Sequence, residues 1–383
     1  MTKYRIKLIG VGAGFLHPVL TTENGRPLVL PNLWADDLMR YRRLNTARSY
    51  LIDLLVVYQW AQSTAIDIHH RISSLTGFRR MEIQRLIKAL FMTSKGMPAS
   101  SQTGYRRVQA IRSFFGFAFD VYCDLLVDPQ ARRDGEKVKE RVLAYIAKYG
   151  DIHRSCPTGG RPATSLSVAE IETVSGALHP ASPANPFADH AVRLRNFCIF
   201  LVAKEIWLRR SELVLLEVSD LNLGANPTIR IKWPSQKNLQ KRRDGAGFKT
   251  NAREVPISDA LAQALAFYLR TARDSFLKPL TVSTALFPSK KDGRRLSSGT
   301  VNTILAAVQR IPEVAALGKR IHPHGLRASG ADEFHRHGTA SNTANLRDCM
   351  EYVGGWAPGS PMPAHYAKKS VAEQVNKMVR KKK

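Results

Sequence analysis

The chain has 383 residues, 44% of them hydrophobic, and 58 lysines and arginines against 31 acidic residues give a formal charge of +27. This hydrophobic content excludes a disordered basic tail, and the length suits two folded domains. The excess of positive charge favours a polyanionic partner such as nucleic acid, bound with salt-sensitive affinity. The charge alone leaves open a basic protein of another kind, such as a ribosome-associated one.

The cysteines and the N-terminus bear on metals and on location. The four cysteines, Cys123, Cys156, Cys198 and Cys349, are scattered without zinc-ligand spacing, which predicts free thiols in a reducing compartment and no metal site. Basic residues precede an apolar run at 8–16, but its glycines and the lack of a cleavage site argue against a signal peptide. No apolar stretch reaches the ~18 residues of a membrane span. We therefore expect a cytoplasmic protein with no membrane partner.

The first half of the chain is predicted to be helical after a short N-terminal segment. Residues 1–34 are expected to form an extended appendage with a turn at Asn24-Gly25-Arg26-Pro27. Residues 35–154 are predicted to form a small all-helical domain, because apolar residues recur at helical spacing at Leu51, Leu54, Leu55 and Tyr58. A linker rich in glycine and proline is predicted at 155–166.

The second domain is predicted over residues 167–383, with helices around a small sheet. Ser167 can cap a helix from Val168, and Ile229, Ile231 and Trp233 alternate with charged residues as in a half-exposed strand. A second strand is predicted at 253–257, and the loop between the two strands is strongly basic. Helices resume after Ser258. The predicted fold class is mainly α with a small antiparallel β-sheet.

Four distant motifs carry residues suited to phosphodiester chemistry. They are Leu-Arg-Arg-Ser-Glu-Leu at 208–213, Lys249-Thr250, His-Gly-Leu-Arg at 324–327, and Gly355-Trp356 with Tyr366 downstream. A phosphodiester attacked by a side-chain oxygen needs cations around its oxygens, a proton donor for the leaving oxygen, and a nucleophile. Arginine donates two hydrogen bonds from a planar fork, and residues three apart share a helix face.

Each motif alone is a weak signal. A structural arginine paired with a carboxylate, a chance HxxR pair, or a lysine facing solvent explains each of them as well. Together, however, they resemble the tyrosine recombinase family, whose members are also called phage-integrase-like recombinases, because the elements occur in that family's order. Residues 45–60 are similar to the family's first core-binding helix, so the resemblance covers most of residues 35–383.

The resemblance implies a helical core-binding domain of the SAM-like type, which binds DNA, and an α+β catalytic domain. It implies that Arg209, His324 and Arg327 hold the scissile phosphate and that Trp356 packs beside it. Tyr366 would then form a 3′-phosphotyrosyl bond while Lys249 protonates the 5′-oxygen. No metal or other cofactor is implied.

The resemblance also implies partners and a biological setting. The expected partners are double-stranded DNA with a specific recombination site, three further copies of the chain in a homotetramer on DNA, and an accessory directionality protein. The expected role is integration or excision of a mobile element, at the nucleoid when DNA is bound. The expected DNA-contacting residues are Arg48, Arg106, Arg107, Lys237, Lys241, Arg242 and Arg243.

Two departures from the family pattern and two alternative functions remain. Tyr366 follows Trp356 by ten positions, one more than is usual, and Ala328 stands where histidine or arginine is common. Tyr352 is the nearest rival nucleophile, but it precedes Gly355-Trp356 and is predicted to lie in a helix. The alternatives are a non-catalytic DNA-binding protein on the same scaffold and a type IB topoisomerase.

Overall fold

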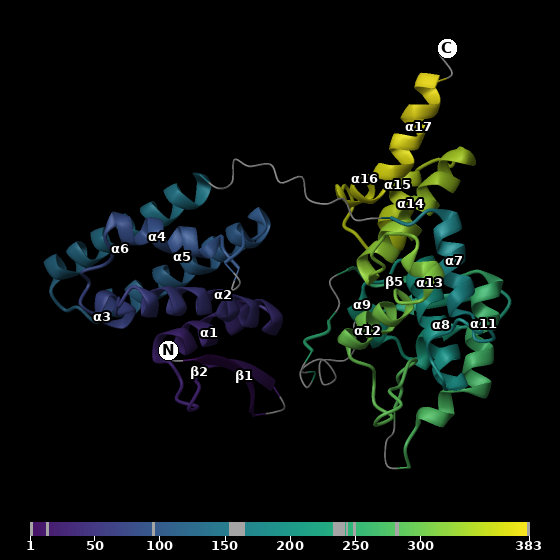
Figure 1. Cartoon of the computed structure of the whole chain (residues 1–383), viewed down its shortest axis with the longest axis horizontal. Coiled ribbons are helices and arrows are strands. Elements are labelled where there is room, and N and C mark those ends of the chain that lie inside the picture. The colour runs from purple at the N-terminus through teal and green to yellow at the C-terminus, as the bar shows by residue number, and fades with distance from the viewer. Residues whose placement is uncertain are drawn as a thin grey trace. The chain divides into compact units, whose positions relative to one another are not determined.

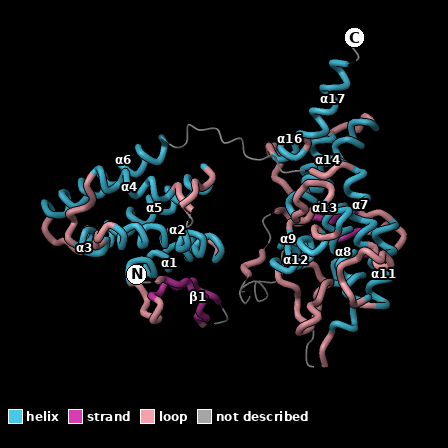
Figure 2. Tube along the Cα trace, viewed as in Figure 1, coloured by secondary structure: helices cyan, strands magenta, loops and turns pink. Residues whose placement is uncertain are grey.

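A computed structural model describes residues 3–12, 15–93, 96–152, 165–232, 242, 244–247, 250–279 and 283–380. The chain divides into two compact units, one of residues 1–160 with 240–245 and the other of residues 161–239 with 246–383 (Figure 1). Most of the predicted linker at 155–166 lies outside the described residues. Figure 2 shows that helices dominate each unit, as the predicted fold class requires.

The first unit combines a β-hairpin with a helical bundle. Strands β1 (Tyr4–Val11) and β2 (Phe15–Thr22) pair antiparallel. The helices that follow are α1 (Val29–Tyr41), α2 (Leu44–Ser63), α3 (Ile68–Ser73), α4 (Arg80–Leu90), α5 (Ser101–Cys123) and α6 (Pro129–Ile152).

The expected appendage at residues 1–34 is part of this unit, which corrects the sequence-based prediction. Leu20 of β2 is fully buried in the same core as Trp34, Leu51 and Phe114, and α1 already begins at Val29. The hairpin therefore contributes apolar surface to the helical core. The prediction missed this because the glycines of the run at 8–16 obscure its strand alternation.

The second unit places a small sheet among helices. Strands β3 (Leu221–Asn222), β4 (Thr228–Ile231) and β5 (Arg253–Pro256) form an antiparallel sheet in that order. The helices are α7 (Val168–Leu178), α8 (His190–Glu205), α9 (Arg210–Leu215), α11 (Asp259–Thr271), α12 (Ser298–Val308), α13 (Pro312–Ala315), α14 (Pro323–Ala340), α15 (Leu346–Gly354), α16 (Met362–Tyr366) and α17 (Lys368–Arg380). Short 3-10 turns lie at Val218–Asp220 and Arg273–Phe276.

Local signals in the second unit behave as the sequence predicts. The side chains of Ser167 and Ser258 cap α7 and α11 by accepting backbone hydrogen bonds three residues on. In β4 the alternating residues Ile229 and Ile231 are fully buried and Arg230 is exposed. Trp233 lies outside the described residues.

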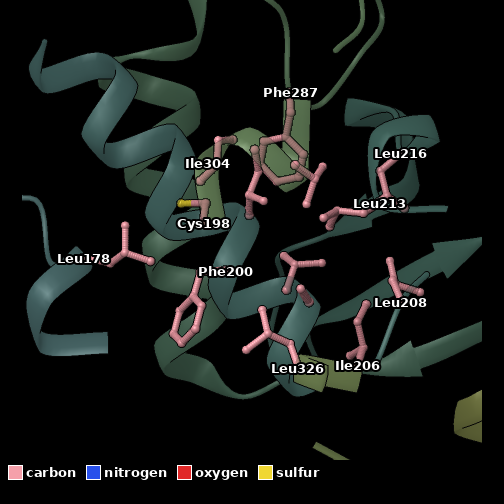
Figure 3. Packing of buried hydrophobic residues seen from close by; sticks show 14 of the residues in the cluster. Leu178, Cys198, Phe200, Ile206, Leu208, Leu213, Leu216, Phe287, Ile304 and Leu326 are labelled. Atoms are coloured by element: carbon pink, nitrogen blue, oxygen red, sulfur yellow. The ribbon is translucent and has the colours of Figure 1, made fainter. Parts of the chain in front are cut away.

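The apolar core of the second unit fixes helix α14. Cys198 and Phe200 of α8 pack with Leu213 of α9 and with Leu326 of α14 in one cluster (Figure 3). Leu326 directly precedes Arg327, so burying this leucine also sets the position of the arginine. Among the described residues, no helix is both long and apolar enough to cross a bilayer, and no cluster of side chains could hold a metal ion.

Helices α8 and α14 approach so closely at Gly330 that a side chain has no space. A Cβ atom there would lie 2.1 Å from the carbonyl oxygen of Lys204 and 2.4 Å from the Trp207 ring. The Lys204 atom is backbone, so it cannot rotate away as a side chain could. The glycine therefore determines how near α14 lies to α8.

We expect Gly330→Ala to lower the free energy of unfolding of the second unit by about 1–3 kcal/mol, because it overpacks this contact. Chemical denaturation of the full chain measures the change. Gly176→Ala is the matched control, since Gly176 also lies in a helix but has no atom within 4 Å of its Cβ position. The control should be neutral or slightly stabilising. Equal losses in both variants would show that the α8–α14 contact is not tight.

Candidate active site

The structure gathers three of the predicted residues, His324, Arg327 and Trp356, around Tyr366. His324 and Arg327 lie in the first two turns of α14, Trp356 follows α15, and Tyr366 ends α16. The Tyr366 oxygen lies 3.4 Å from His324 Nδ1, and its ring stacks on Trp356 with 5.3 Å between centroids. The Arg327 guanidinium carbon lies 5.5 Å from the Tyr366 ring centroid and 5.1 Å from that of Trp356. Residues from two separate sequence motifs therefore form one cluster.

Arg327 is held by backbone carbonyl groups on two sides. Its side chain is buried, and its terminal nitrogens donate to the carbonyl oxygens of Trp207 and Gly354, the latter at 3.0 Å. Trp207 has a φ of +50°, a left-handed conformation that is costly for a bulky residue. This bend turns the chain between α8 and α9 and places a carbonyl against Arg327. Backbone strain therefore helps to aim the guanidinium.

Arg209 directly precedes α9, and the carboxylate of Glu212 holds Arg209 at this position. The Arg209 amide donates to Glu212 Oε2 at 3.0 Å, and Arg209 Nη1 lies 3.3 Å from Glu212 Oε1. Arg209 is close enough to lower the pKa of Arg327, although burial is the larger cause of that lowering. The Arg209 side chain is 29% exposed, so it can reach an incoming ligand. The Arg209 and Arg327 guanidinium groups thus lie near each other and near His324.

Three further polar residues belong to this network but were not among the predicted site residues. Glu212 is completely buried and accepts from Thr250 Oγ1 at 3.0 Å. Thr250 in turn accepts from Arg253 Nη1 at 3.1 Å. Burial, with Arg327 and Arg209 nearby, lowers the pKa of Arg253 to about 10. All three residues lie within or beside the sequence motifs, which was the available signal, but only their burial separates them from ordinary polar neighbours.

Lys249 lies outside the described residues, as do Lys237, Lys241 and Arg243 of the basic loop. Arg242 is described, and its guanidinium pairs with Asp244 at 2.7 Å. The predictions for the four undescribed residues stay predictions.

The expected DNA contacts in the first unit differ from one another. Arg48 is exposed on α2. Arg106 is half exposed and lies 2.9 Å from the buried carboxylate of Asp53, whose pKa burial raises to about 6. Arg107 has a side chain that is 16% exposed, and its Nη1 donates to two backbone carbonyl oxygens near the end of α4, at 2.8 and 2.7 Å. These two hydrogen bonds give Arg107 a structural role, and its predicted contact with DNA stays a prediction.

The segment between Trp356 and Tyr366 is one residue longer than usual, and it places Tyr366 beside Arg327 of the same chain. Within it the Gly359 amide donates to Glu351 Oε2 at 3.1 Å, which ties the loop to α15. The rival Tyr352 is 54% exposed in α15 and donates to the carbonyl oxygen of Glu254 at 2.7 Å. Ala328, the second departure, is 2% exposed and packs in the cluster that contains Trp356. Tyr366, and not Tyr352, is therefore the tyrosine that lies beside Arg327.

Helix α17 is fastened to α14 of the same chain directly after Tyr366. The Ser370 amide donates to Asp332 at 2.8 Å, and Arg336 pairs with Glu373 at 3.0 Å. Val371, Val375 and Met378 form an apolar stripe along α17, and they are 42%, 51% and 69% exposed. Each of these side chains therefore keeps exposed apolar surface in the described structure.

The surroundings of His324 favour the neutral imidazole. Burial is the largest cause that lowers its pKa, followed by the nearby His322 and Arg327. A neutral ring in contact with the Tyr366 hydroxyl can accept its proton. The described residues thus offer a hydroxyl, a proton acceptor and guanidinium groups, which are groups that nucleophilic attack on a phosphodiester requires.

Comparison with known proteins identifies the family. The family model described as "Phage integrase family" matches residues 179–372. The chain belongs to this family. Tyrosine recombinase XerD of Pseudomonas aeruginosa is 30% identical over 297 residues, covering 71% of this chain and 88% of XerD. Tyrosine recombinase XerC of Lactobacillus delbrueckii subsp. bulgaricus is 26% identical over 314 residues, covering 81% and 87%.

A solved structure is similar in fold. The Tn1549 transposon integrase, in complex with a circular intermediate DNA, aligns over 90% of this chain and 99% of its own with a TM-score of 0.55 and 14% identity. At that identity the likeness supports the fold alone, and it confirms the predicted recombinase architecture. With the family established, the chain is a tyrosine-type site-specific recombinase.

The lowered pKa of His324 makes the stability of this recombinase depend on pH. The pKa is lowered from 6.5, so the folded state binds fewer protons than the unfolded state in the interval below 6.5. The stabilisation is complete above pH 6.5 and is lost as the pH falls through the folded-state pKa. His322 and His335, whose pKa values are also lowered by burial, act in the same direction.

We therefore expect His324→Gln to lose less free energy of unfolding between pH 7 and pH 5 than the unsubstituted chain loses. Denaturant unfolding at a series of pH values measures the slope. His70→Gln, at an exposed position in α3, is the control and should keep the original slope. If His324→Gln also kept the original slope, the neutral state of His324 in the fold would be contradicted.

Proposed function

We propose that this recombinase cuts and rejoins DNA through a covalent bond between Tyr366 and a 3′-phosphate. The observation that carries the proposal is the position of the Tyr366 hydroxyl, 3.4 Å from His324 Nδ1 and beside Arg327 within one chain. A nucleophile in contact with a proton acceptor and flanked by cations is the arrangement that attack on a phosphodiester needs.

The proposed first step transfers one DNA strand to the protein. Arg209 and Arg327 neutralise the non-bridging oxygens of the scissile phosphate, and His324 accepts the proton of the Tyr366 hydroxyl. The bond from phosphorus to the tyrosine oxygen forms while the bond to the 5′-oxygen breaks. Lys249 donates a proton to that departing oxygen. Trp356, stacked on the tyrosine ring, limits the directions from which Tyr366 can approach.

The second step is the reverse attack by a 5′-hydroxyl. Because the phosphotyrosyl ester keeps the energy of the original phosphodiester, a 5′-hydroxyl from another strand can displace the tyrosine without ATP. If that strand comes from a second duplex, the outcome is recombination. The chain itself supplies each of the side chains that this cycle requires.

Double-stranded DNA bearing a specific site is the proposed substrate. The charge of +27 favours a polyanion, and the Tn1549 integrase of similar fold is described in complex with a DNA intermediate. Joining two duplexes calls for a homotetramer on DNA, and the exposed apolar stripe of α17 offers surface for a neighbouring subunit. Movement of a mobile element, an accessory directionality protein and a nucleoid location complete the proposal.

Replacing the nucleophile tests the chemistry directly. We expect Tyr366→Phe to abolish covalent capture of a nicked suicide duplex that carries the cognate site, because no other tyrosine contacts Arg327 among the described residues. Denaturing gel electrophoresis detects the adduct. Tyr352→Phe is the matched control and should retain the adduct, since Tyr352 lies on the exposed side of α15.

The same assay separates the alternatives. Capture that persists in Tyr366→Phe would refute the assignment of the nucleophile. DNA affinity without capture by the unsubstituted chain would favour the non-catalytic DNA-binding protein. Relaxation of supercoils without joining of two sites would favour the topoisomerase.

Two arginines of the first unit should affect DNA binding differently. We expect Arg48→Ala to weaken binding and to reduce the slope of log affinity against log salt by about 1, as loss of a phosphate contact does. Arg107→Ala should leave the salt slope unchanged and lower the stability of the first unit, because it empties an internal hydrogen-bonding site. Fluorescence anisotropy over a salt series, with thermal unfolding alongside, measures both. A salt slope reduced by Arg107→Ala would contradict the structural role.

A further inference from the structure

The segment that leads from Thr250 into β5 is hydrogen-bonded directly to the segment that carries Trp356. The Asn251 amide donates to the carbonyl oxygen of Gly355 at 3.0 Å, and the Asn251 side chain lies 3.4 Å from the carbonyl oxygen of Trp356. Arg253 Nε donates to the carbonyl oxygen of Val353 at 2.8 Å. Each of these acceptors lies in the short segment from the end of α15 to Trp356.

Arg253 is the side chain that joins the two segments most extensively. Its Nη1 donates to Thr250 Oγ1 and to the carbonyl oxygen of Asn251, both at 3.1 Å, while its Nε bonds across to Val353. A guanidinium can do this because its donors are fixed in one plane and diverge. One rigid group therefore sets the distance between the first residues of β5 and the end of α15.

The position of Arg253 in its strand argues against a role in apolar packing. Arg253 and Val255 occupy the inward-facing positions of β5, and Arg253 is only 7% exposed. An apolar residue would fill that space without the desolvation cost of a buried cation. The cost is reflected in the pKa of Arg253, which burial lowers to about 10. The arginine is therefore explained by its hydrogen bonds.

Gly355 shows how close the contact is. It has a φ of +64°, and a Cβ atom there would lie 2.3 Å from Arg253 Nη1 and 2.8 Å from Thr250 Cβ. Glycine adopts this left-handed conformation without strain, and it has no Cβ atom that would clash with Arg253 or Thr250. The backbone of Gly355 packs directly against the side chains of Arg253 and Thr250, which leaves no space for a side chain at position 355.

We propose that Arg253 is a positioning residue that locks the start of β5, four residues beyond Lys249 along the chain, to the Trp356 segment, so that the part of the chain leading from the proton donor is held against the tyrosine side of the active site. The inference rests on the proposed role of Lys249 as the acid that protonates the leaving 5′-oxygen. Arg253 acts through the residues it holds and makes no contact with DNA in this proposal. Loss of Arg253 should therefore impair proton donation specifically.

A substrate that needs no proton on its leaving group tests this specificity. Two suicide duplexes would carry either oxygen or sulfur as the 5′-bridging atom of the scissile phosphate. A thiolate leaves readily without being protonated, because the pKa of a thiol is far below that of an alcohol. We expect Arg253→Ala to cleave the oxygen substrate at least about tenfold more slowly than the unsubstituted recombinase and the sulfur substrate within about threefold of it, a fraction of the usual general-acid effect. Single-turnover cleavage rates give the ratio.

Further variants keep the test decisive if Arg253→Ala folds poorly in a thermal unfolding control. Arg253→Lys keeps the charge but loses the planar fork, so it should show the same selective defect. Asn251→Ala removes one exposed contact with Trp356 and should show a smaller defect of the same sign. Arg230→Ala is the matched control, because Arg230 is an exposed arginine on the adjacent strand β4, and its ratio should equal that of the unsubstituted recombinase.

Equal slowing of both substrates by Arg253→Ala and Arg253→Lys would overturn the inference, because it would show a general structural defect. Lys249→Ala, run in parallel, separates this failure from failure of the proposed function. If sulfur rescues Lys249→Ala but not the Arg253 variants, the inference alone is wrong. If sulfur does not rescue Lys249→Ala, the lysine is not the acid, and the inference fails together with that part of the mechanism.

Discussion

Burial of several positive charges around one carboxylate is the constraint on which the active site depends. Arg327 and Arg253 are almost completely buried, Arg209 lies beside them, and Glu212 is the fully buried anion that their network shares. Like charges repel strongly at low dielectric, so such a cluster persists only if hydrogen bonds and a counter-charge offset the repulsion. One carboxylate among three guanidinium groups leaves a net positive site, which suits a phosphate.

The backbone provides the remaining compensation. Carbonyl oxygens of Trp207, Val353 and Gly354 accept from the buried arginines, and two of these carbonyls come from the end of α15. The chain reaches these positions through left-handed residues, Trp207 and Gly355. Strain at Trp207 is tolerated because it is repaid in a hydrogen bond to a buried cation. The site is thus organised by main-chain geometry as much as by its side chains.

Arginines of the first unit differ in whether their donors are engaged inside the domain. A formal charge of +27 favours DNA, but it does not say which cations face outward. Arg107 is used to satisfy carbonyl oxygens at the end of α4 and lies near the buried Asp53, whereas Arg48 is free of the core. Burial decides the role, because a guanidinium without water must find its partners inside the protein.

The sequence by itself determined the family and the helical fold class with its small sheet, because short motifs and apolar periodicity are local properties. The same motifs singled out Arg209, His324, Arg327, Trp356 and Tyr366 as candidate active-site residues. It did not reveal that the N-terminal hairpin joins the core, that Arg107 bonds backbone carbonyl groups at the end of α4, or that Glu212, Thr250 and Arg253 form a buried network. Those facts depend on contacts between segments up to about a hundred positions apart, such as Arg253 with Val353. Only tertiary packing decides which polar groups lose water and must pair with one another.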